Sequence, residues 1–280
     1  MATNSLDAVL AQYEKAQQTG NYTPKISQEE RLKRYFAAIL GDNEKQGQKR
    51  LRILPTTDGS SPFKEAMFHE MLVDGKYVKL YDPAMDNERS PLNEVYEELL
   101  IEGDKKLASE YKSRKFYIVK VIDRDNEADG PKFWRFKHNY KNEGILDKII
   151  PIWRNKGDIT DAENGRDLII ELAKSKTPKG KEYTTVSAIM YDDPTPVHAD
   201  KDQAKEWITD ELAWTDVYSK KPVEYLEAIA RGETPKWDND KGGYVYGDST
   251  ESEETIGGTK TSKKVVDPQA DADVDTDLPF

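Results

Sequence analysis

The chain has 280 residues, of which 53 are acidic and 42 basic, giving a formal net charge of −11. By length alone it holds one large domain with extensions or two small domains. Hydrophobic residues make up 36%, below the ~45–50% typical of compact domains, so part of the chain is expected to lie outside any core. The absence of cysteine excludes disulfides, thiolate zinc sites and cysteine nucleophiles.

No targeting or membrane segment is evident. The residues from Met1 to Leu10 lack the basic and apolar regions of a secretory signal. No apolar run approaches the ~18 residues of a membrane helix. These features predict a soluble protein of a reducing cytoplasm with no membrane partner.

The charge is divided unevenly along the chain. From Lys105 to Lys141 there are 11 basic and 5 acidic residues, whereas from Gly247 to Phe280 there are 3 basic and 9 acidic. An acidic total argues against a simple nucleic-acid binder, because phosphate contact needs cations. A local basic segment within an acidic chain leaves such a role open.

The first half predicts two helices followed by strands. Ser27 with Glu30 three residues later has the spacing of a capping box. Alternating apolar and polar residues predict strands, and Val73-Asp74-Gly75 predicts a hairpin turn. The expected helices span Asn4 to Gln18 and Ser27 to Leu40; the expected strands span Lys49 to Leu54, Phe63 to Leu72 and Lys76 to Tyr81.

The second half predicts a small β-rich body with helical insertions. The expected strands span Lys115 to Asp123, Lys132 to His138, Leu168 to Lys174 and Tyr183 to Tyr191. The expected helices span Pro91 to about Lys112, Ile145 to Trp153, and Asp202 to Gly232 with an interruption near Pro222. Beyond Lys236 apolar periodicity is lost, and the composition predicts a disordered acidic tail.

No catalytic constellation is visible, and the chain is predicted not to be an enzyme. The three histidines, His69, His138 and His198, are far apart in sequence, and none forms a metal-spaced pair. A phosphate-binding glycine loop, a Gly-x-Ser-x-Gly elbow and a His-Glu-x-x-His motif are all missing. Acidic pairs such as Asp192-Asp193 are typical of solvated turns.

Basic and aromatic residues are interleaved between Lys105 and Lys141. Single-stranded nucleic acid needs cations along its phosphates and ring faces on which unstacked bases lie. On the strand from Lys132 to His138, alternation places Phe133, Arg135 and Lys137 on one face, predicted to meet ligand, and Trp134 and Phe136 on the core face. The hairpin strand repeats the pattern with Tyr77, Lys79 and Tyr81, and the first strand with Arg50 and Arg52. The alternative is ordinary cross-strand aromatic packing with solubilising cations.

The chain ends in acidic residues followed by Leu278-Pro279-Phe280. A terminal ring, a free carboxylate and adjacent acids suit a basic pocket on a partner protein. The same charges are expected to compete with nucleic acid for the chain's own basic surface. The residues predicted to bind partners are Asp273, Asp275, Asp277, Leu278, Pro279 and Phe280.

From about Gln48 to Tyr191 the chain resembles the single-stranded DNA-binding, helix-destabilising proteins of T4-type bacteriophages. The resemblance lies in Leu51-Arg52-Ile53-Leu54-Pro55 with Pro62-Phe63, the turn Asp74-Gly75-Lys76-Tyr77, the strand from Phe116 to Asp123, and Lys132-Phe133-Trp134-Arg135-Phe136-Lys137 followed by Leu146-Asp147-Lys148-Ile149. The tip of the tail is also similar to the Asp-rich, Pro-Phe ending of bacterial single-stranded DNA-binding proteins.

The resemblance implies a β-rich α+β fold around an OB-fold, a five-stranded Greek-key barrel, with helical insertions and flanking helices. It implies an N-terminal helical arm (1–24), a DNA-binding core (25–236) with a helical subdomain near 82–112, and an acidic tail (237–280). The expected function is coating single-stranded DNA during phage replication, recombination and repair in the cytoplasm of an infected bacterium. The implied partners are replication proteins, namely a polymerase, a helicase or its loader, and a recombination mediator, with cooperative self-association on DNA.

These expectations name two sets of site residues. Those predicted to contact phosphates are Arg50, Arg52, Lys76, Arg114, Lys115, Lys120, Lys132, Arg135 and Lys137. Those predicted to stack on bases are Tyr77, Tyr81, Phe116, Tyr117, Phe133 and Tyr183.

The chain departs from the family at its zinc site, which uses one His and three Cys. His69 matches the His, whereas the Cys positions read Tyr81, Ser90 and Asn93. Because a closed structural site needs four ligands, no zinc and no other cofactor is expected. Packing by Leu92, Val95, Tyr96, Leu99 and Leu100 is expected to hold the subdomain instead. The family's basic N-terminal cooperativity motif is also not evident, since only Lys15 is basic before Lys25.

Two other functions remain open. An RNA-binding protein would use the same barrel, and only contacts to the 2′-hydroxyl would distinguish it. A phage interaction or structural protein without a nucleic-acid ligand would use the aromatic residues in a protein interface.

Overall fold

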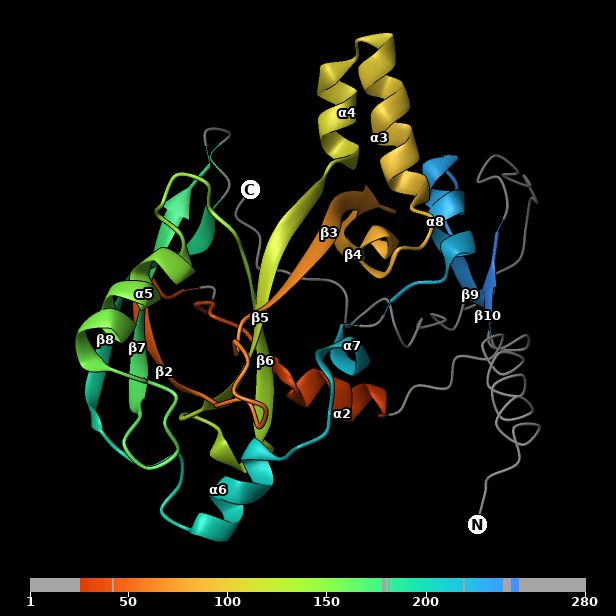
Figure 1. Cartoon of the computed structure of the whole chain (residues 1–280). Helices are drawn as coiled ribbons and strands as arrows, with labels where there is room; N and C mark the ends of the chain where they lie inside the picture. The colour runs from red at the N-terminus through yellow and green to blue at the C-terminus, as the bar shows by residue number, and fades with distance from the viewer. Residues whose placement is uncertain are drawn as a thin grey trace, which may run out of the picture.

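The protein is described here from a computed structural model that covers residues 26–41, 43–177, 180, 182–218, 220–238 and 243–246. These residues form a mixed α+β fold around one large, mostly antiparallel sheet (Figure 1). The expected helix from Asn4 to Gln18 and the expected partner-binding end of the tail lie outside the described residues.

The sheet runs in the order β1-β6-β5-β2-β7-β8, with β3 added to β5 and β4 added to β3. Only β1 and β6 run parallel among the pairings of the described strands. A separate hairpin joins β9 to β10. The strands are β1 (Tyr35–Phe36), β2 (Gln46–Ile53), β3 (Lys64–Val73), β4 (Lys76–Tyr81), β5 (Ser113–Asp123), β6 (Pro131–Lys137), β7 (Arg166–Lys176), β8 (Glu182–Pro194), β9 (Lys236–Asp238) and β10 (Gly243–Val245).

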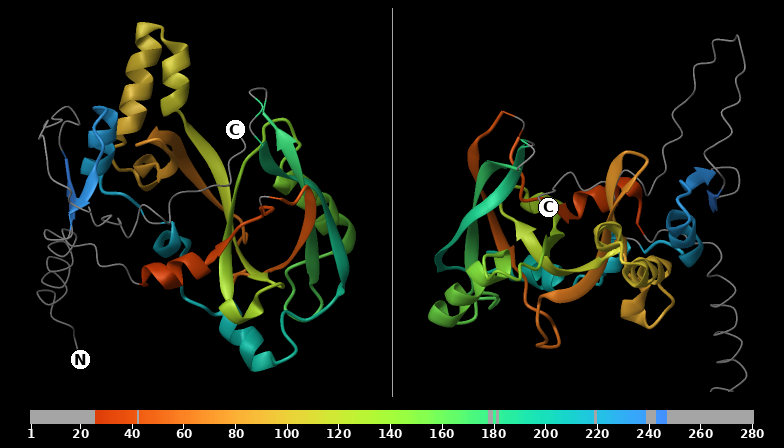
Figure 2. Two further views of the ribbon diagram at one scale, coloured as in Figure 1. Left: turned by 180° about the vertical axis from the view of Figure 1, so that it is seen from behind. Right: turned by 90° about the horizontal axis from the view of Figure 1, so that it is seen from above.

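The helices lie between and beyond the strands. Helices α3 and α4 form a hairpin that stands away from the sheet where β5 begins (Figures 1 and 2). The α-helices are α2 (Gln28–Lys33), α3 (Pro91–Glu102), α4 (Lys105–Tyr111), α5 (Ile145–Lys156), α6 (Lys201–Ile208), α7 (Trp214–Val217) and α8 (Val223–Ala230); the 3-10 helices are η2 (Pro83–Asp86) and η3 (Glu127–Asp129).

The sheet is curved but not closed. Strands β1 and β8 are its two ends, and no backbone pairing between described residues joins them. The expected five-stranded barrel is therefore not confirmed. The two ends do approach each other, because the Leu40 backbone amide after β1 donates to Thr184 Oγ1 of β8 at 3.2 Å.

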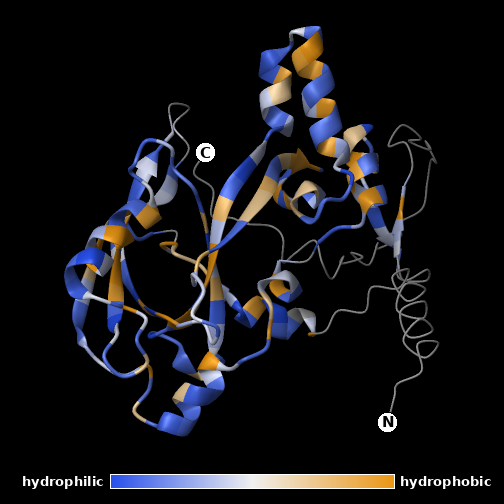
Figure 3. Cartoon of the chain, in the orientation of Figure 1, coloured by the Kyte–Doolittle hydropathy of each residue, from blue (hydrophilic) through white to orange (hydrophobic). Residues whose placement is uncertain are grey.

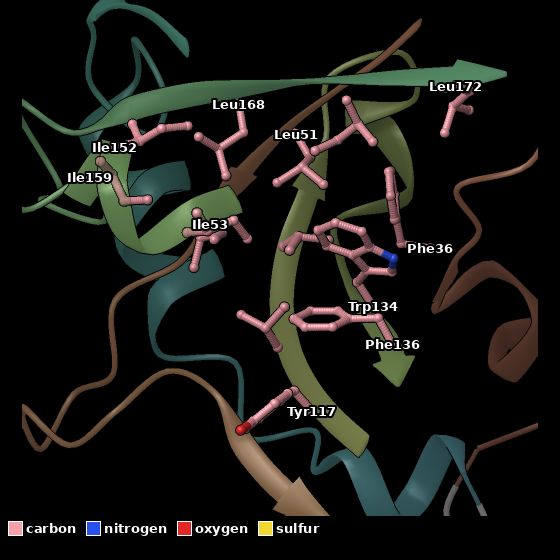
Figure 4. Close-up of a cluster of buried hydrophobic side chains, with 14 of the residues drawn as sticks. Phe36, Leu51, Ile53, Tyr117, Trp134, Phe136, Ile152, Ile159, Leu168 and Leu172 are labelled. Carbon is pink, nitrogen blue, oxygen red and sulfur yellow. The ribbon is translucent and has the colours of Figure 1, made fainter. Parts of the chain in front are cut away.

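A hydrophobic core fills the concave side of this sheet beneath α5. It collects Leu51, Trp134, Phe136, Ile159 and Leu168, all almost fully buried (Figure 4). The alternation of β6 had predicted Trp134 and Phe136 on the core face, and the structure confirms both. On β5 the odd-numbered residues enter this core, so the even-numbered residues face the other side of the sheet.

Three expected helical regions differ from the prediction, and the one from Asp202 to Gly232 holds α6, α7 and α8, with a second break at 209–213 besides the expected one near Pro222. The helix that Ser27 caps, through a 3.1 Å bond from the Glu30 amide to its Oγ, ends at Lys33 rather than Leu40. Phe36 is needed as a strand residue beside Trp134 of β6, and this tertiary pairing overrides helical propensity. The expected helix from Pro91 to Lys112 is divided at Gly103, whose φ of 88° ends α3 before Asp104 caps α4.

The C-terminal part follows one edge of the molecule. Figure 1 shows the chain passing from α6 upward through α7 to α8, beside α3. The ordered structure continues past 237, the expected start of the tail, because Trp237 and Tyr244 of the β9-β10 hairpin contact each other and Tyr244 contacts Tyr225 of α8.

Gly165 should be intolerant of any side chain. A Cβ atom there would lie 2.4 Å from the Asp161 carbonyl oxygen and 2.7 Å from that of Ile159, and backbone atoms cannot swing away. We expect Gly165→Ala to lower the free energy of unfolding by about 1–3 kcal/mol, measured by urea denaturation. Gly243→Ala is the control, because nothing lies within 4 Å of its Cβ position. Equal stability of the two variants would contradict this account of the turn before β7.

Candidate nucleic-acid interface

Strands β4, β3, β5 and β6 share one face that is rich in rings and cations. The registers place Tyr81 beside Phe68, Phe68 beside Arg114, Phe116 beside Lys137 and Ile118 beside Arg135. Figure 3 shows β5 hydrophilic where it leaves α4 and hydrophobic farther along. We call this surface the aromatic–basic face; it consists of Tyr77, Lys79, Tyr81, Phe68, Glu70, Arg114, Phe116, Ile118, Lys120, Phe133, Arg135 and Lys137.

The open end of the aromatic–basic face is positively charged. Among its described residues Glu70 is the sole carboxylate. It forms ion pairs with Arg114 Nε at 3.2 Å and with Lys137 Nζ. The Arg114 side chain is 40% exposed and that of Lys137 31%, whereas that of Glu70 is 13% exposed. Lys79, paired with Glu70 across the strands, lies 5.9 Å from the Phe116 ring centroid. Arg114 and Lys137 therefore reach solvent, whereas Lys79 is buried and the acid that balances these cations is largely covered.

The other end of this face is covered by residues 210–218, which we call the covering segment. Val217 and Tyr218 are buried against Phe68, Phe116 and Phe133. The predicted stacking rings Tyr81, Phe116 and Phe133 are consequently 6%, 2% and 5% exposed. The prediction placed them on the correct face, but it treated them as open to solvent, which is wrong for this structure.

Three predicted contact residues are structural. Arg52 is fully buried, and its Nε donates to Asp167 Oδ1 at 2.9 Å. Lys132 is buried, with Nζ 3.2 Å from Asp123 Oδ2. Tyr117 points to the opposite side of β5, into the main core. These three residues cannot reach a ligand on the aromatic–basic face, so the prediction is wrong for them.

The remaining predicted residues are spread over several surfaces. Arg50 is exposed on β2 and pairs with Asp192 at 2.6 Å, and Lys115 pairs with Glu65 at 2.9 Å on the opposite side of β5 from Arg114. Tyr183 lies half-buried on β8, and Lys76 is exposed at the β3-β4 turn. The structure therefore brings together on the face only part of the predicted set: Tyr77, Tyr81, Phe116, Phe133, Arg114, Lys120, Arg135 and Lys137.

Four residues of this site were absent from the predicted contacts. Alternation had already placed Lys79 on the ligand face with Tyr77 and Tyr81, although it was not named as a phosphate contact. Phe68 lies on a strand that was predicted but from which no contact residue was taken, and its period-two pattern could have found it. Trp214 and Tyr218 lie in the covering segment, about 80 residues beyond β6, and no local pattern connects them with the sheet. Their placement on the sheet depends on tertiary packing and not on local sequence.

Lys120 shows how the covered end differs from the open end. Its Nζ donates to the Asp210 backbone carbonyl at 2.6 Å and lies 5.4 Å from the Phe133 ring centroid. Burial lowers the pKa of Lys120 from its usual value. The ammonium has exchanged water for a carbonyl and a ring face, which are contacts that a nucleotide can also provide.

A buried polar cluster joins the β3-β4 hairpin to α3. His69 Nδ1 lies 2.6 Å from the Tyr111 carbonyl oxygen, and His69 Nε2 lies 3.7 Å from Asp82 Oδ2. Asn93 Nδ2 donates to Asp82 Oδ2 at 2.9 Å. The resemblance had assigned one lost zinc ligand to Tyr81, but the structure puts Asp82 beside His69 and turns Tyr81 toward the aromatic–basic face.

Hydrophobic packing supplements this cluster. Of the residues expected to hold the helical subdomain, Leu92 is fully buried among Leu80, Tyr225, Leu226 and Ile229. Leu100 is 40% exposed and does not serve that purpose. Helix α8, from far along the chain, thus provides much of the packing surface.

No protein-family profile matches the chain, and no curated protein shows detectable sequence similarity to it. Across the described ranges, no group of three or more His, Cys, Asp or Glu side chains is placed to hold a metal ion. None of the helices in the described part is long and apolar enough to cross a membrane.

Asp82 should make folding sensitive to acid. Burial acts to raise its pKa, but interactions with His69, Ser90 and Asn93 outweigh burial and hold the pKa of Asp82 well below its usual value. A lowered native pKa adds stability above the unfolded-state pKa of about 3.9, and this stability is lost as the pH falls below it. We expect Asp82→Asn to lower the free energy of unfolding at pH 7 by about 1.5–3 kcal/mol and to flatten its dependence on pH between about 5 and 2.

The measurement is a series of denaturant titrations across this pH range. Glu97→Gln on the exposed side of α3 removes the same charge outside the cluster and is the control. If Asp82→Asn kept the acid dependence of the wild-type chain, Asp82 would not be the group responsible.

Proposed function

We propose that this chain binds single-stranded DNA along the aromatic–basic face, with the open end as the first point of contact. The observation that carries the proposal is the gathering of Lys79, Arg114, Arg135 and Lys137 with aromatic rings on one sheet face of an acidic protein. Cations that follow phosphates and rings that accept bases are the two requirements for binding unpaired strands.

The finer parts of the proposal rest on the sequence resemblance. We propose that the curved sheet is an OB-fold variant, which the approach of Leu40 to Thr184 supports. We also propose a role in phage replication, recombination and repair, with the acidic C-terminal residues binding replication proteins. No catalytic activity and no cofactor enter the proposal.

Electrostatics favours an unpaired strand at this face. A flexible strand can lower its phosphates onto Arg114 and Lys137 while its bases turn toward the sheet. Each ion pair with Glu70 contributes at most about 1 kcal/mol in a partly exposed setting, so a phosphate can replace it. The Glu70 carboxylate therefore competes with phosphate for the same cations.

The direct test is a fluorescence titration with oligo(dT) at several salt concentrations. The logarithm of the affinity should fall with the logarithm of salt, by about 0.7 per phosphate contacted. In the double variant Arg114→Gln, Lys137→Gln the slope should become shallower by roughly 1.4, and the affinity at 0.1 M salt should fall by more than tenfold. Lys201→Gln on α6, whose side chain is 81% exposed, is the control and should behave as the wild type.

The proposal fails if neither the wild-type chain nor a form lacking residues 247–280, which keeps the β9-β10 hairpin, binds oligo(dT). Matched RNA oligomers decide the nucleic-acid class: tighter binding of RNA would replace DNA as the ligand. Binding that is unchanged in the double variant would place the site elsewhere on the molecule.

Glu70→Gln should have the opposite effect. It removes the acid that pairs with Arg114 and Lys137 and retains a side chain of the same shape. The affinity for oligo(dT) should therefore rise, by about two- to fivefold at 0.1 M salt. Glu65→Gln, which frees Lys115 on the opposite side of β5, is the matched control and should change the affinity much less. Weaker binding by Glu70→Gln would show that Glu70 positions the cations rather than competing with phosphate.

A further inference from the structure

The covering segment contacts the aromatic–basic face through a backbone carbonyl at one end and a ring at the other, and its acid binds Arg34, which lies outside the face and contacts β6. At its start, the Asp210 carboxylate lies 3.3 Å from Arg34 Nη1, and the Asp210 carbonyl accepts from Lys120 Nζ. At its end, Tyr218 donates from its hydroxyl to the Phe133 carbonyl at 3.1 Å.

The Tyr218 ring occupies the position of a stacking partner. The Arg135 guanidinium carbon lies 4.2 Å from its centroid and 4.8 Å from that of Phe68. Tyr35 meets the same ring edge-on, with centroids 5.0 Å apart. A base on this surface would need the same guanidinium plane and the same neighbouring rings.

Trp214 extends the pattern toward the open end. Its ring centroid is 5.7 Å from that of Tyr81 and 6.5 Å from that of Phe68. Unlike Val217 and Tyr218, Trp214 is only partly buried. The covering segment thus presents a carbonyl and two rings in sequence over a cation and rings of the sheet, and its anion lies on the neighbouring Arg34.

We infer that residues 210–218 are a built-in competitor for single-stranded DNA: they occupy base and phosphate positions of the face when no strand is bound, and binding of a strand releases them. This inference rests on the proposed function and adds its regulation. The observed affinity is then the affinity of the uncovered face multiplied by the fraction of molecules that are uncovered.

Uncovering would extend the usable surface. The open end supplies Arg114 and Lys137, and the covered end adds Lys120, Arg135 and Phe133. The strand would therefore first meet the exposed cations and then exchange its phosphates and bases, one by one, for Asp210, Trp214 and Tyr218. The exchange needs no change in the sheet itself.

The test weakens the covering contact without touching the face. Asp210→Asn removes the charge that Arg34 contacts. It keeps the Oδ1 acceptor to which the Leu212 amide donates at 2.7 Å. Glu211→Gln, at the exposed neighbouring position, removes the same charge and is the matched control. We expect Asp210→Asn to bind oligo(dT) about two- to fivefold more tightly than Glu211→Gln at equal salt.

Hydrogen exchange on the wild-type chain supplies an independent measurement. The Tyr218 amide donates to the Trp214 carbonyl at 2.8 Å, and the Asp216 amide to that of Ala213 at 3.0 Å. Saturating oligo(dT) should speed exchange at these two amides while it slows exchange in β3, β5 and β6. A permanent wall of the site would instead be protected further by the ligand.

The outcomes separate this inference from the proposed function. Equal affinities of the two variants, with slower exchange at Tyr218, would overturn the competitor and leave DNA binding intact. Binding by Asp210→Asn with none by the wild type would support both. No binding by either variant or by the wild type would overturn the proposed function and the competitor with it.

Discussion

The alternation of side chains across β5 determines most of this structure. This strand pairs with β2, β3 and β6 inside the sheet. Each of its side chains therefore points either into the main core or toward the aromatic–basic face. Tyr117, Val119 and Val121 fill the main core, whereas Arg114, Phe116 and Lys120 belong to the aromatic–basic face. A shift of one residue in register would exchange the two sets and bury Arg114 and Lys120 in the apolar core, at a cost of several kcal/mol for each ion. The cost of burying Arg114 and Lys120 in a shifted register therefore fixes the register of β5.

The two classes of cation in this protein differ in what surrounds them. Arg52 and Arg124 both contact the Asp167 carboxylate in a setting with little solvent, and loss of one partner there would leave an uncompensated buried charge costing about 3–5 kcal/mol. Arg114 and Lys137 instead share a carboxylate at the surface, where ion pairs contribute about 0–1 kcal/mol. Under the proposed function, a cation of the second class exchanges its partner for a phosphate at little cost. Burial, rather than the presence of a positive charge, separates Arg52 and Arg124 from Arg114 and Lys137.

The sequence predicted elements better than it predicted exposure. The turn at Asp74 and Gly75, with φ of 50° and 73°, and the strands on either side follow directly from local chemistry. Alternation also identified the faces of β4 and β6 correctly. Alternation cannot say which face meets solvent, because α5 covers one side of this sheet and residues 195–218 cover part of the other. Arg52 follows the same period as an exposed cation, and only its contacts with Asp167 and Thr195 show that it is internal.

The free energy that holds the covering segment in place is comparable with the free energy that a strand would gain on the face. Exchange between the two is therefore physically reasonable. Burying a side chain such as Val217 or Tyr218 contributes about 1.5–3 kcal/mol, so closing the segment is favoured when the chain is alone. A base stacked on an aromatic ring contributes about 1–3 kcal/mol, and each phosphate contact adds counterion release. Under the proposed function, one nucleotide would therefore not displace Val217, Trp214 and Tyr218 together, whereas several neighbouring nucleotides on one strand would. Binding that had to open its own site would respond to the length of unpaired strand rather than to single nucleotides, and this response would distinguish a strand from free nucleotides.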